Sequence, residues 1–161
     1  MPELTVNSPL GPLTLIEADG AIIALDWRRA VKEEPSKLLK TGKDELEGYF
    51  SAELKMFSLP VNPKGTAFQK QVWEQMVKIP YGQVLTYGNV AKTLSSSPRA
   101  VGTACGRNPI PIIIPCHRIM GANGKLTGYT GAGGTKTKSF LLDLESHQAR
   151  LPLADNPESP S

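Results

Sequence analysis

The strongest constraint in the sequence is an apolar run that ends in a proline and three polar residues. Residues 112–114 are all isoleucine, so we expect them to be buried as a strand or another core segment. Pro115 ends any regular ladder because it has no backbone N–H. Cys116, His117 and Arg118 follow at once, and three polar groups in a row are costly to bury without a purpose.

A thiol next to a base is typical of an activated nucleophile, because the thiolate and not the thiol is the reactive form. Adjacent side chains of an extended chain point to opposite faces. We therefore expect a water molecule to link Cys116 with His117, unless the backbone turns sharply. The alternative is that Cys116 is only a small buried apolar residue. The sequence thus offers Cys116 as a candidate nucleophile and His117 as its candidate base.

The length and composition are those of a globular protein. The chain has 161 residues, enough for one ordinary domain or two small ones, with 40% hydrophobic and 20% charged residues. It has no apolar run of about 18 residues that would predict a transmembrane helix, and its first residues lack the pattern of a signal peptide. Two cysteines make no disulfide framework, which favours a reducing compartment. We therefore expect a protein of the cytoplasm or, in a eukaryote, of the nucleus.

Charge is unevenly distributed along the chain, although the net charge is only +3. Residues 1–63 carry seven Lys/Arg and ten Asp/Glu, whereas residues 64–150 carry eleven and three. The change coincides with a proline- and glycine-containing stretch at 53–65, which is typical of a linker. We predict an N-terminal domain at 1–63, a second domain at 64–150 and a disordered tail at 151–161. The basic second domain indicates an anionic partner, with a merely solvated basic surface as the alternative.

The N-terminal half has the pattern of a small antiparallel sheet followed by a helix. Apolar and polar residues alternate over 3–27, with turn residues between the expected strands. A helix is expected at about 36–52, although Gly42 weakens that prediction. No residue of 28–52 suggests a chemical role.

The second half has the pattern of a helical domain. Thr66 and Gln69 fit a capping box at the start of an amphipathic helix. Two short helices are expected at about 86–94 and 98–107, and Ser97 can cap the second of them. Two short helices around a brief turn, in a basic region, suggest a helix-turn-helix.

A last helix is expected at about 135–148, after a tight turn at 122–125 and a glycine-rich loop at 127–134. The predicted fold class is therefore α/β (α+β). It consists of a small N-terminal antiparallel sheet with a helix, and a mostly helical, winged-helix-like C-terminal domain that contains a helix-turn-helix.

Residues 115–119, Pro-Cys-His-Arg-Ile, resemble the active-site signature of the O6-alkylguanine-DNA alkyltransferases, also called methylated-DNA–protein-cysteine methyltransferases. Further matches to this family occur in order and at fitting spacings, densely over residues 66–147. They lie at residues 79–82, 86–88, 99–102, 107–110, 128–131 and 144–145. The resemblance implies an α/β N-terminal domain and a C-terminal domain whose helix-turn-helix enters the minor groove of double-stranded DNA.

The resemblance also implies a reaction. The protein would rotate an O6-alkylguanine out of the duplex and transfer the alkyl group, irreversibly and once, to Cys116. His117 would take the thiol proton through a water, and Glu145 would hold and polarise His117. Tyr87 would donate its hydroxyl toward N3 of the leaving guanine. The resemblance implies a monomer that needs no cofactor or metal and does not bind membranes.

Three further residues would have roles in DNA binding or in the structure of the site. On the same resemblance, Arg99 would fill the space left by the flipped base, and Asn108 would brace the turn between the recognition helix and the active site. Arg118 would be structural or would contact a phosphate.

Backbone groups would line the pocket for the flipped base. The N–H of Thr130 would face O6, and the carbonyls of Cys116 and Ile119 would accept hydrogen bonds from the exocyclic amine. Tyr129 and Gly131 complete the substrate-binding set. The family more often has serine at the position of Thr130, but a backbone contact should tolerate threonine.

A zinc site is the first alternative reading of the Cys and His residues. Cys105, Cys116, His117 and His147 number four, but their spacing matches no common zinc finger. Residues 1–63 contain neither cysteine nor histidine. No metal is therefore expected.

Three alternative functions compete with alkyl transfer. A non-catalytic protein that binds alkylguanine lesions would lack the cysteine, which is present here. A helix-turn-helix regulator should carry polar base-reading side chains on its second helix, whereas residues 98–107 are mainly small residues between two arginines. A cysteine hydrolase would need turnover, and an alkylated thioether has no easy hydrolytic exit.

Overall fold

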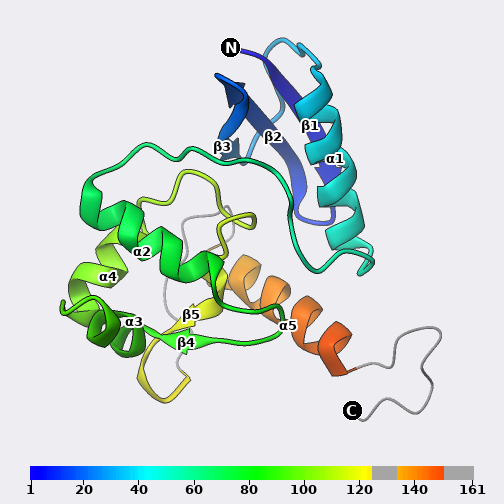
Figure 1. Cartoon of the computed structure of the whole chain (residues 1–161). Helices are drawn as coiled ribbons and strands as arrows, with labels where there is room; N and C mark the ends of the chain where they lie inside the picture. The colour runs from blue at the N-terminus through cyan, green and yellow to red at the C-terminus, as the bar shows by residue number, and fades with distance from the viewer. Residues whose placement is uncertain (125–133, 151–161) are drawn as a thin grey trace.

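The computed structural model describes residues 1–124 and 134–150, with side chains described up to residue 146. Figure 1 shows a small sheet with one helix in one half of the molecule and a group of short helices in the other. A single cluster of buried apolar side chains runs through both halves. Both halves therefore contribute to the surroundings of any site at their junction.

The sheet contains the strands β1 (Glu3–Ser8), β2 (Gly11–Ala18) and β3 (Ala21–Asp26), antiparallel and in that order. Its register pairs Leu4 with Leu15 and Val6 with Leu13, and all four side chains are buried. The turn between β2 and β3 has Asp19 and Gly20 with positive φ, as the sequence pattern predicts. The predicted antiparallel sheet is confirmed.

Helix α1 (Lys37–Phe50) packs on this sheet, and the side chain of Ser36 caps its start. Gly42 lies inside the helix for a packing reason, because a Cβ at this position would come within 2.7 Å of Leu15 Cδ1. Glycine at this position lowers the helix propensity but allows α1 to lie close to β2.

The stretch that follows α1 runs along the edge of the sheet. The backbone N–H of Ile22 donates to the Pro60 carbonyl, and the N–H of Asn62 donates back to Ile22, both at 2.9 Å. In addition, the N–H of Leu25 donates to the Pro109 carbonyl. Hydrogen bonds therefore tie β3 both to this stretch and to the loop before the active-site signature.

Three capped helices follow: α2 (Ala67–Val77), α3 (Tyr87–Thr93) and α4 (Pro98–Cys105). The side chains of Thr66, Thr86 and Ser97 accept hydrogen bonds from the first turns of these helices, and α2 and α3 have complete capping boxes. Helix α2 packs against α4, and Trp73 Nε1 on α2 donates to the Ala104 carbonyl on α4 at 2.9 Å. The arrangement of α3, turn and α4 is the predicted helix-turn-helix.

The isoleucine run is buried, but it is not a regular strand. Ile112 has a φ of +74°, which is incompatible with an extended ladder, and Cys116 begins a 3₁₀ turn, η1 (Cys116–Arg118). The short strand β5 (Ile119–Met120) directly follows this turn and pairs in parallel with the short strand β4 (Leu85–Thr86). The core-segment alternative is therefore right, and the strand alternative is wrong.

The last described elements are η2 (Ala122–Gly124) and α5 (Thr135–Arg150), which packs on η1. Asn123 and Gly124 both have positive φ, as in a tight Asn-Gly turn. The helix ends agree with the predicted ranges to within two residues. Within the described ranges, no helix has the length and apolar character needed to span a membrane.

Candidate active site

Cys116 lies at a sharp turn of the backbone. Its N–H donates to the Ile114 carbonyl at 2.8 Å, and the N–H of Arg118 donates to the Pro115 carbonyl at 3.0 Å. The sequence left open whether the backbone turns sharply here, and it does, because Pro115, at φ −81° and ψ 69°, leads directly into the 3₁₀ turn. The Cys116 side chain is buried, with 4% exposure, and the two cysteines form no disulfide.

His117 is fully buried and bound to Glu145, with Nε2 and Oε2 2.6 Å apart. Burial on its own raises the pKa of Glu145, but interactions with His117 and then Arg118 outweigh it and lower that pKa to about 2. Burial lowers the pKa of His117, against the opposing effect of Glu145. An ionised carboxylate facing a neutral imidazole requires the proton on Nε2.

Nδ1, the other imidazole nitrogen of His117, is the atom of the His117–Glu145 pair that can accept a proton. With the proton on Nε2, Nδ1 is a bare acceptor, and it has no hydrogen-bond partner among the residues that the structure describes. A buried acceptor of this kind, beside a cysteine and backed by a carboxylate, can take a proton from a thiol directly or through a water. The geometry therefore supports His117 as the base.

Arg118 is the second partner of Glu145. Its Nε donates to Oε1 at 2.8 Å and its Nη2 to Oε2 at 2.9 Å, while Nη1 donates to the Ile79 carbonyl at 2.7 Å. The side chain is buried among these partners. Of the two predicted roles for Arg118, the structural one agrees with this geometry and the phosphate contact does not.

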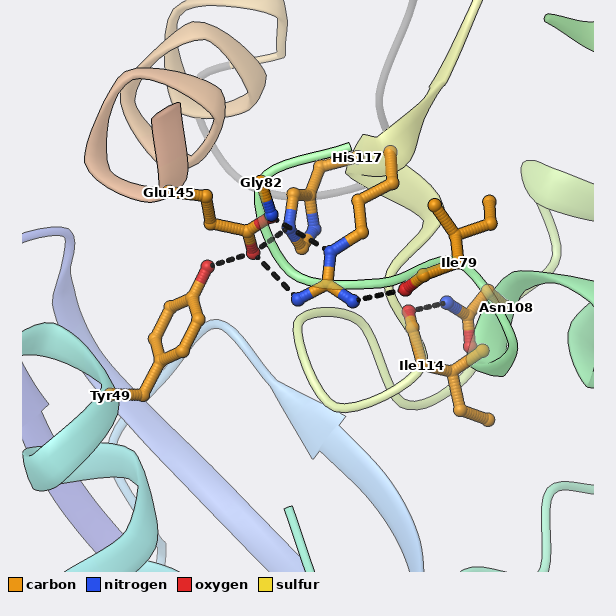
Figure 2. Close-up of polar contacts among 8 residues, drawn as sticks. Tyr49, Ile79, Gly82, Asn108, Ile114, His117 and Glu145 are labelled. Atoms are coloured by element: carbon orange, nitrogen blue, oxygen red, sulfur yellow. Dashed lines mark hydrogen bonds and ion pairs between the residues drawn. The ribbon is translucent and has the colours of Figure 1, made fainter. Parts of the chain in front are cut away.

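Tyr49 reaches the same carboxylate from the other half of the molecule. It lies on α1, 96 residues away in the sequence, and its hydroxyl donates to Glu145 Oε2 at 2.6 Å. Figure 2 shows this approach from the α1 side, opposite to His117. Residues 28–52 suggested no chemical role by sequence, but Tyr49 contacts a carboxylate of the candidate site. We call Tyr49, His117, Arg118 and Glu145 the Glu145 cluster.

Asn108 and Ile119 shape the backbone around Cys116. Asn108 is buried, its Nδ2 donates to the Ile114 carbonyl and its Oδ1 accepts from the N–H of Ile110, both at 2.9 Å. These bonds suit the predicted bracing role. The N–H of Ile119 donates to the Cys116 carbonyl, so one of the two expected acceptor carbonyls already holds one protein partner.

Tyr87 and Arg99 lie on the helix-turn-helix. Tyr87 is the first residue of α3, is half-buried against the core and lies next to α4, where a Cβ on Gly102 would be 3.8 Å from Tyr87 Cε1. Arg99 lies in the first turn of α4 and is exposed. The structure thus brings Tyr87 toward the interior and leaves Arg99 on the surface.

Lys138 is a buried charged residue that the sequence reasoning missed. It lies on α5 and is fully buried, as is Leu141, and Glu145 is buried on the same helix. Spacings of three and four residues put these positions on one face of a helix. The signal in the sequence that could have indicated its burial is a lysine within an apolar helical stripe.

Several predicted site residues lie outside the described part of the chain. They are Tyr129, Thr130 and Gly131. Within the described part there is no group of three or more His, Cys, Asp or Glu residues that could hold a metal ion.

Comparison with known proteins covers both halves of the chain. Residues 67–147 match the family model "6-O-methylguanine DNA methyltransferase, DNA binding domain", and residues 3–63 match "6-O-methylguanine DNA methyltransferase, ribonuclease-like domain".

Individual relatives agree with these matches. The methylated-DNA–protein-cysteine methyltransferase of Methanosarcina mazei is 51% identical over 155 residues, which are 90% of this chain and 97% of that protein. The constitutive one of Bacillus subtilis is 42% identical and covers 88% of this chain and 93% of its own. The crystal structure of Mycobacterium tuberculosis OGT in complex with DNA superposes with a TM-score of 0.82 at 40% identity, over 92% of this chain and 94% of that one. The chain therefore belongs to the 6-O-methylguanine DNA methyltransferase family.

Proposed function

We propose that this protein repairs DNA by transferring the alkyl group of O6-alkylguanine to its own Cys116, irreversibly and once per molecule. The observation that carries the proposal is the His117 ring, held by an ionised buried Glu145 so that Nδ1 is left as a proton acceptor next to Cys116. Relatives over most of the chain are named methylated-DNA–protein-cysteine methyltransferases, and OGT of Mycobacterium tuberculosis forms a complex with DNA.

The chemical step is a single displacement. The thiol proton of Cys116 passes through a water to His117 Nδ1, and the thiolate attacks the alkyl carbon on O6. The carbon–oxygen bond breaks, its electron pair goes to the guanine, and Tyr87 donates a proton toward N3 of the leaving base. The product is an uncharged thioether, which has no easy hydrolytic exit, so the protein is consumed. The backbone N–H of Thr130 is expected to face O6.

DNA would be bound by the helix-turn-helix. Helix α4 exposes Arg99 and Thr103 at its surface, with Gly102 between them, and such small residues allow a helix to approach the floor of a minor groove. Arg99 would take the place of the flipped nucleotide in the stack. Extrusion of the base would deliver O6 to Cys116, which lies beyond reach of a guanine still inside a duplex.

Intact mass measurement tests the proposal. The full chain is mixed with a duplex that carries one O6-methylguanine, in parallel with Cys116→Ser and with Cys105→Ser as the matched control. We expect the wild type and the Cys105 variant to gain one methylene, mapped to Cys116 and limited to one equivalent, and Cys116→Ser to gain none. Tight binding without a mass change would establish a non-catalytic lesion-binding protein. Neither an adduct nor binding would reopen the regulator and hydrolase alternatives.

We further propose that the chain has two domains, residues 1–63 and 64–150, and acts as a monomer. Because its substrate is DNA, we expect it to work in the cytoplasm or, in a eukaryote, in the nucleus.

A further inference from the structure

Lys138 is a buried cation for which the reaction scheme above has no use. Its side chain has 0% exposure, and Nζ has no hydrogen-bond partner in the described ranges 1–124 and 134–150. The ring of Tyr87 faces this ammonium group, with its centroid 5.7 Å from Nζ. A buried ammonium group without hydrogen bonds is costly, so its presence calls for a reason.

The two buried cysteines are the groups on which the charge of Lys138 acts. Burial lowers the pKa of Lys138, whereas electrostatic interactions with Cys116 and then Cys105 oppose that effect. The same lysine also opposes the rise in the pKa of Cys105, which burial causes and Cys116 increases. The charge of Lys138 therefore acts on both cysteines.

Lys138 and Glu145 act on the Cys116–His117 pair from the same helix. They lie about two turns apart on α5, which packs on the turn that carries Cys116 and His117. The carboxylate binds His117, and the ammonium group is one of the charges that lower the pKa of His117 and keep it neutral. One rigid element thus positions a negative charge behind the base and a positive charge near the nucleophile.

We propose that Lys138 is a positioning residue for alkyl transfer, whose ammonium group stabilises the thiolate of Cys116 and so increases the fraction of protein ready to attack the alkyl carbon. This inference rests on the proposed function. The thiol proton still goes to His117, and Lys138 neither gains nor loses a proton. After transfer, the sulfur carries the alkyl group as a neutral thioether and the electron pair has left with the guanine.

The groups that face Cys116 and Lys138 determine what a pH titration reports. Cys105, on α4, has a pKa raised well above its ordinary value by burial and stays a neutral thiol. His117 is neutral, and the ring of Tyr87 faces Lys138 Nζ. Glu145 is already paired with His117 and Arg118. Among the described charged groups around Cys116, Lys138 is thus the one whose side chain has no hydrogen-bond partner.

The test follows the reactivity of Cys116 with iodoacetamide as a function of pH. This neutral reagent reports the thiolate fraction, and peptide mass spectrometry separates Cys116 from Cys105. The full-length wild type is compared with Lys138→Met, which keeps an apolar stem, and with Lys138→Arg, which keeps the charge. Lys136→Met, an exposed position on the same helix, is the matched control. Single-turnover transfer from an O6-methylguanine duplex is measured in parallel.

We expect Lys138→Met to move the midpoint of the Cys116 profile upward by about one pH unit and to slow transfer about tenfold near neutrality. The high-pH limit should stay at the wild-type value, and Lys138→Arg and Lys136→Met should keep the wild-type midpoint. The Tm of Lys138→Met should equal or exceed that of the wild type, because an apolar group replaces a buried cation. If this variant does not fold, Lys138→Gln replaces it in the same comparison.

An unchanged midpoint in Lys138→Met would overturn the inference, even if transfer were lost, because the lysine would then act on the fold or on DNA. A rate that falls equally at all pH values would also overturn it. If the midpoint shifts as expected but the wild type takes no methyl group from DNA, the proposed function fails while the electrostatic role of Lys138 stands.

Discussion

The Glu145 cluster is buried and bonded across the fold, whereas the helix-turn-helix is exposed and bonded within itself. The carboxylate of Glu145 receives hydrogen bonds from Tyr49 on α1 and from His117 and Arg118 on η1. Helices α3 and α4 instead begin with caps whose partners are three residues away, at Thr86 and Ser97. One region depends on long-range contacts and the other on local ones.

This difference explains why the buried carboxylate and the exposed DNA-binding surface lie in different regions of the molecule. A carboxylate keeps its charge in a buried site only if many donors face it, and the fold has to bring those donors from distant segments. A DNA-binding surface needs exposed cations and small residues on a helix, which a short capped segment can supply. Substitutions in the two regions should therefore affect different measurements.

Glu145→Gln should have the largest effect on stability. It removes the charge that compensates Arg118, and breaking a buried ion pair by removing one partner costs about 3–5 kcal/mol. It should also abolish transfer, because His117 loses the carboxylate that holds its tautomer. Urea unfolding and single-turnover transfer measure the two effects. Glu74→Gln, at an exposed position of α2, should change neither, and an equal loss there would refute the special role of Glu145.

Acid should destabilise the protein through the same carboxylate. The folded-state pKa of Glu145, about 2, lies below its ordinary value of 4.5, so the unfolded chain binds more protons. The stabilisation is complete above pH 4.5 and is lost as the pH falls through 2, by about 3 kcal/mol. The lowered pKa of His117 acts with the same sign below 6.5.

Urea unfolding between pH 7 and pH 3 measures this dependence. Other carboxylates titrate in the same window, so the informative quantity is the difference between wild type and Glu145→Gln. The variant should lose less stability on acidification than the wild type. Parallel pH profiles for the two proteins would contradict the assignment to Glu145.

Tyr49→Phe should cost less than Glu145→Gln, because it removes one donor from a carboxylate that keeps the others. A hydrogen bond to a charged group contributes about 2 kcal/mol. Burial raises the pKa of Tyr49 well above its ordinary value, so its hydroxyl is a donor at all relevant pH values. Urea unfolding measures the loss.

Tyr81→Phe is the matched control for this substitution. Tyr81 packs against Tyr49, with ring centroids 6.2 Å apart, but its buried hydroxyl has no hydrogen-bond partner in the described structure. Its removal should leave the free energy of unfolding almost unchanged. Similar losses in both variants would mean that ring packing, and not the bond to Glu145, explains the effect of Tyr49→Phe.

Arg99→Ala should leave stability unchanged and weaken DNA binding. Arg99 is exposed on α4, so its truncation should alter the free energy of unfolding by less than about 0.5 kcal/mol. The Kd for a duplex, measured at fixed salt in a Cys116→Ser background, should rise about tenfold. Lys37→Ala, on α1, removes the same charge from a surface away from the helix-turn-helix and should leave the Kd within about twofold. Equal weakening by both would indicate a general effect of net charge.

Local signals explain what could be predicted of the fold. The caps at Thr66, Thr86 and Ser97 and the Asn-Gly turn at 123–124 act within a few residues, and the structure has all of them. The isoleucine run shows where such reasoning ends. Apolar character predicts burial but not conformation, and the positive φ of Ile112 is imposed by the contacts of the loop and not by its own preference.

The candidate site likewise has residues that the sequence predicts and residues that only the fold brings in. Cys116, His117 and Glu145 follow from a nucleophile-and-base pattern and from the family resemblance, and the 2.6 Å contact between His117 and Glu145 supports their association. Neither the nucleophile-and-base pattern nor the resemblance pointed to Tyr49 or Lys138. A tyrosine in an apolar helix face usually packs in the core, and a lysine in a helix usually faces solvent.

By itself, the sequence determined the order and ends of the helices, the sheet and the chemical types in the active-site turn. These depend on side chains near one another in the chain, whose caps, turns and periodicity act over a few residues. Only the tertiary structure decided which groups share the Glu145 carboxylate, which nitrogen of His117 is left as the acceptor, and that Lys138 is buried near the ring of Tyr87. Those outcomes depend on desolvation and on distances between residues up to 96 positions apart, which no local pattern encodes.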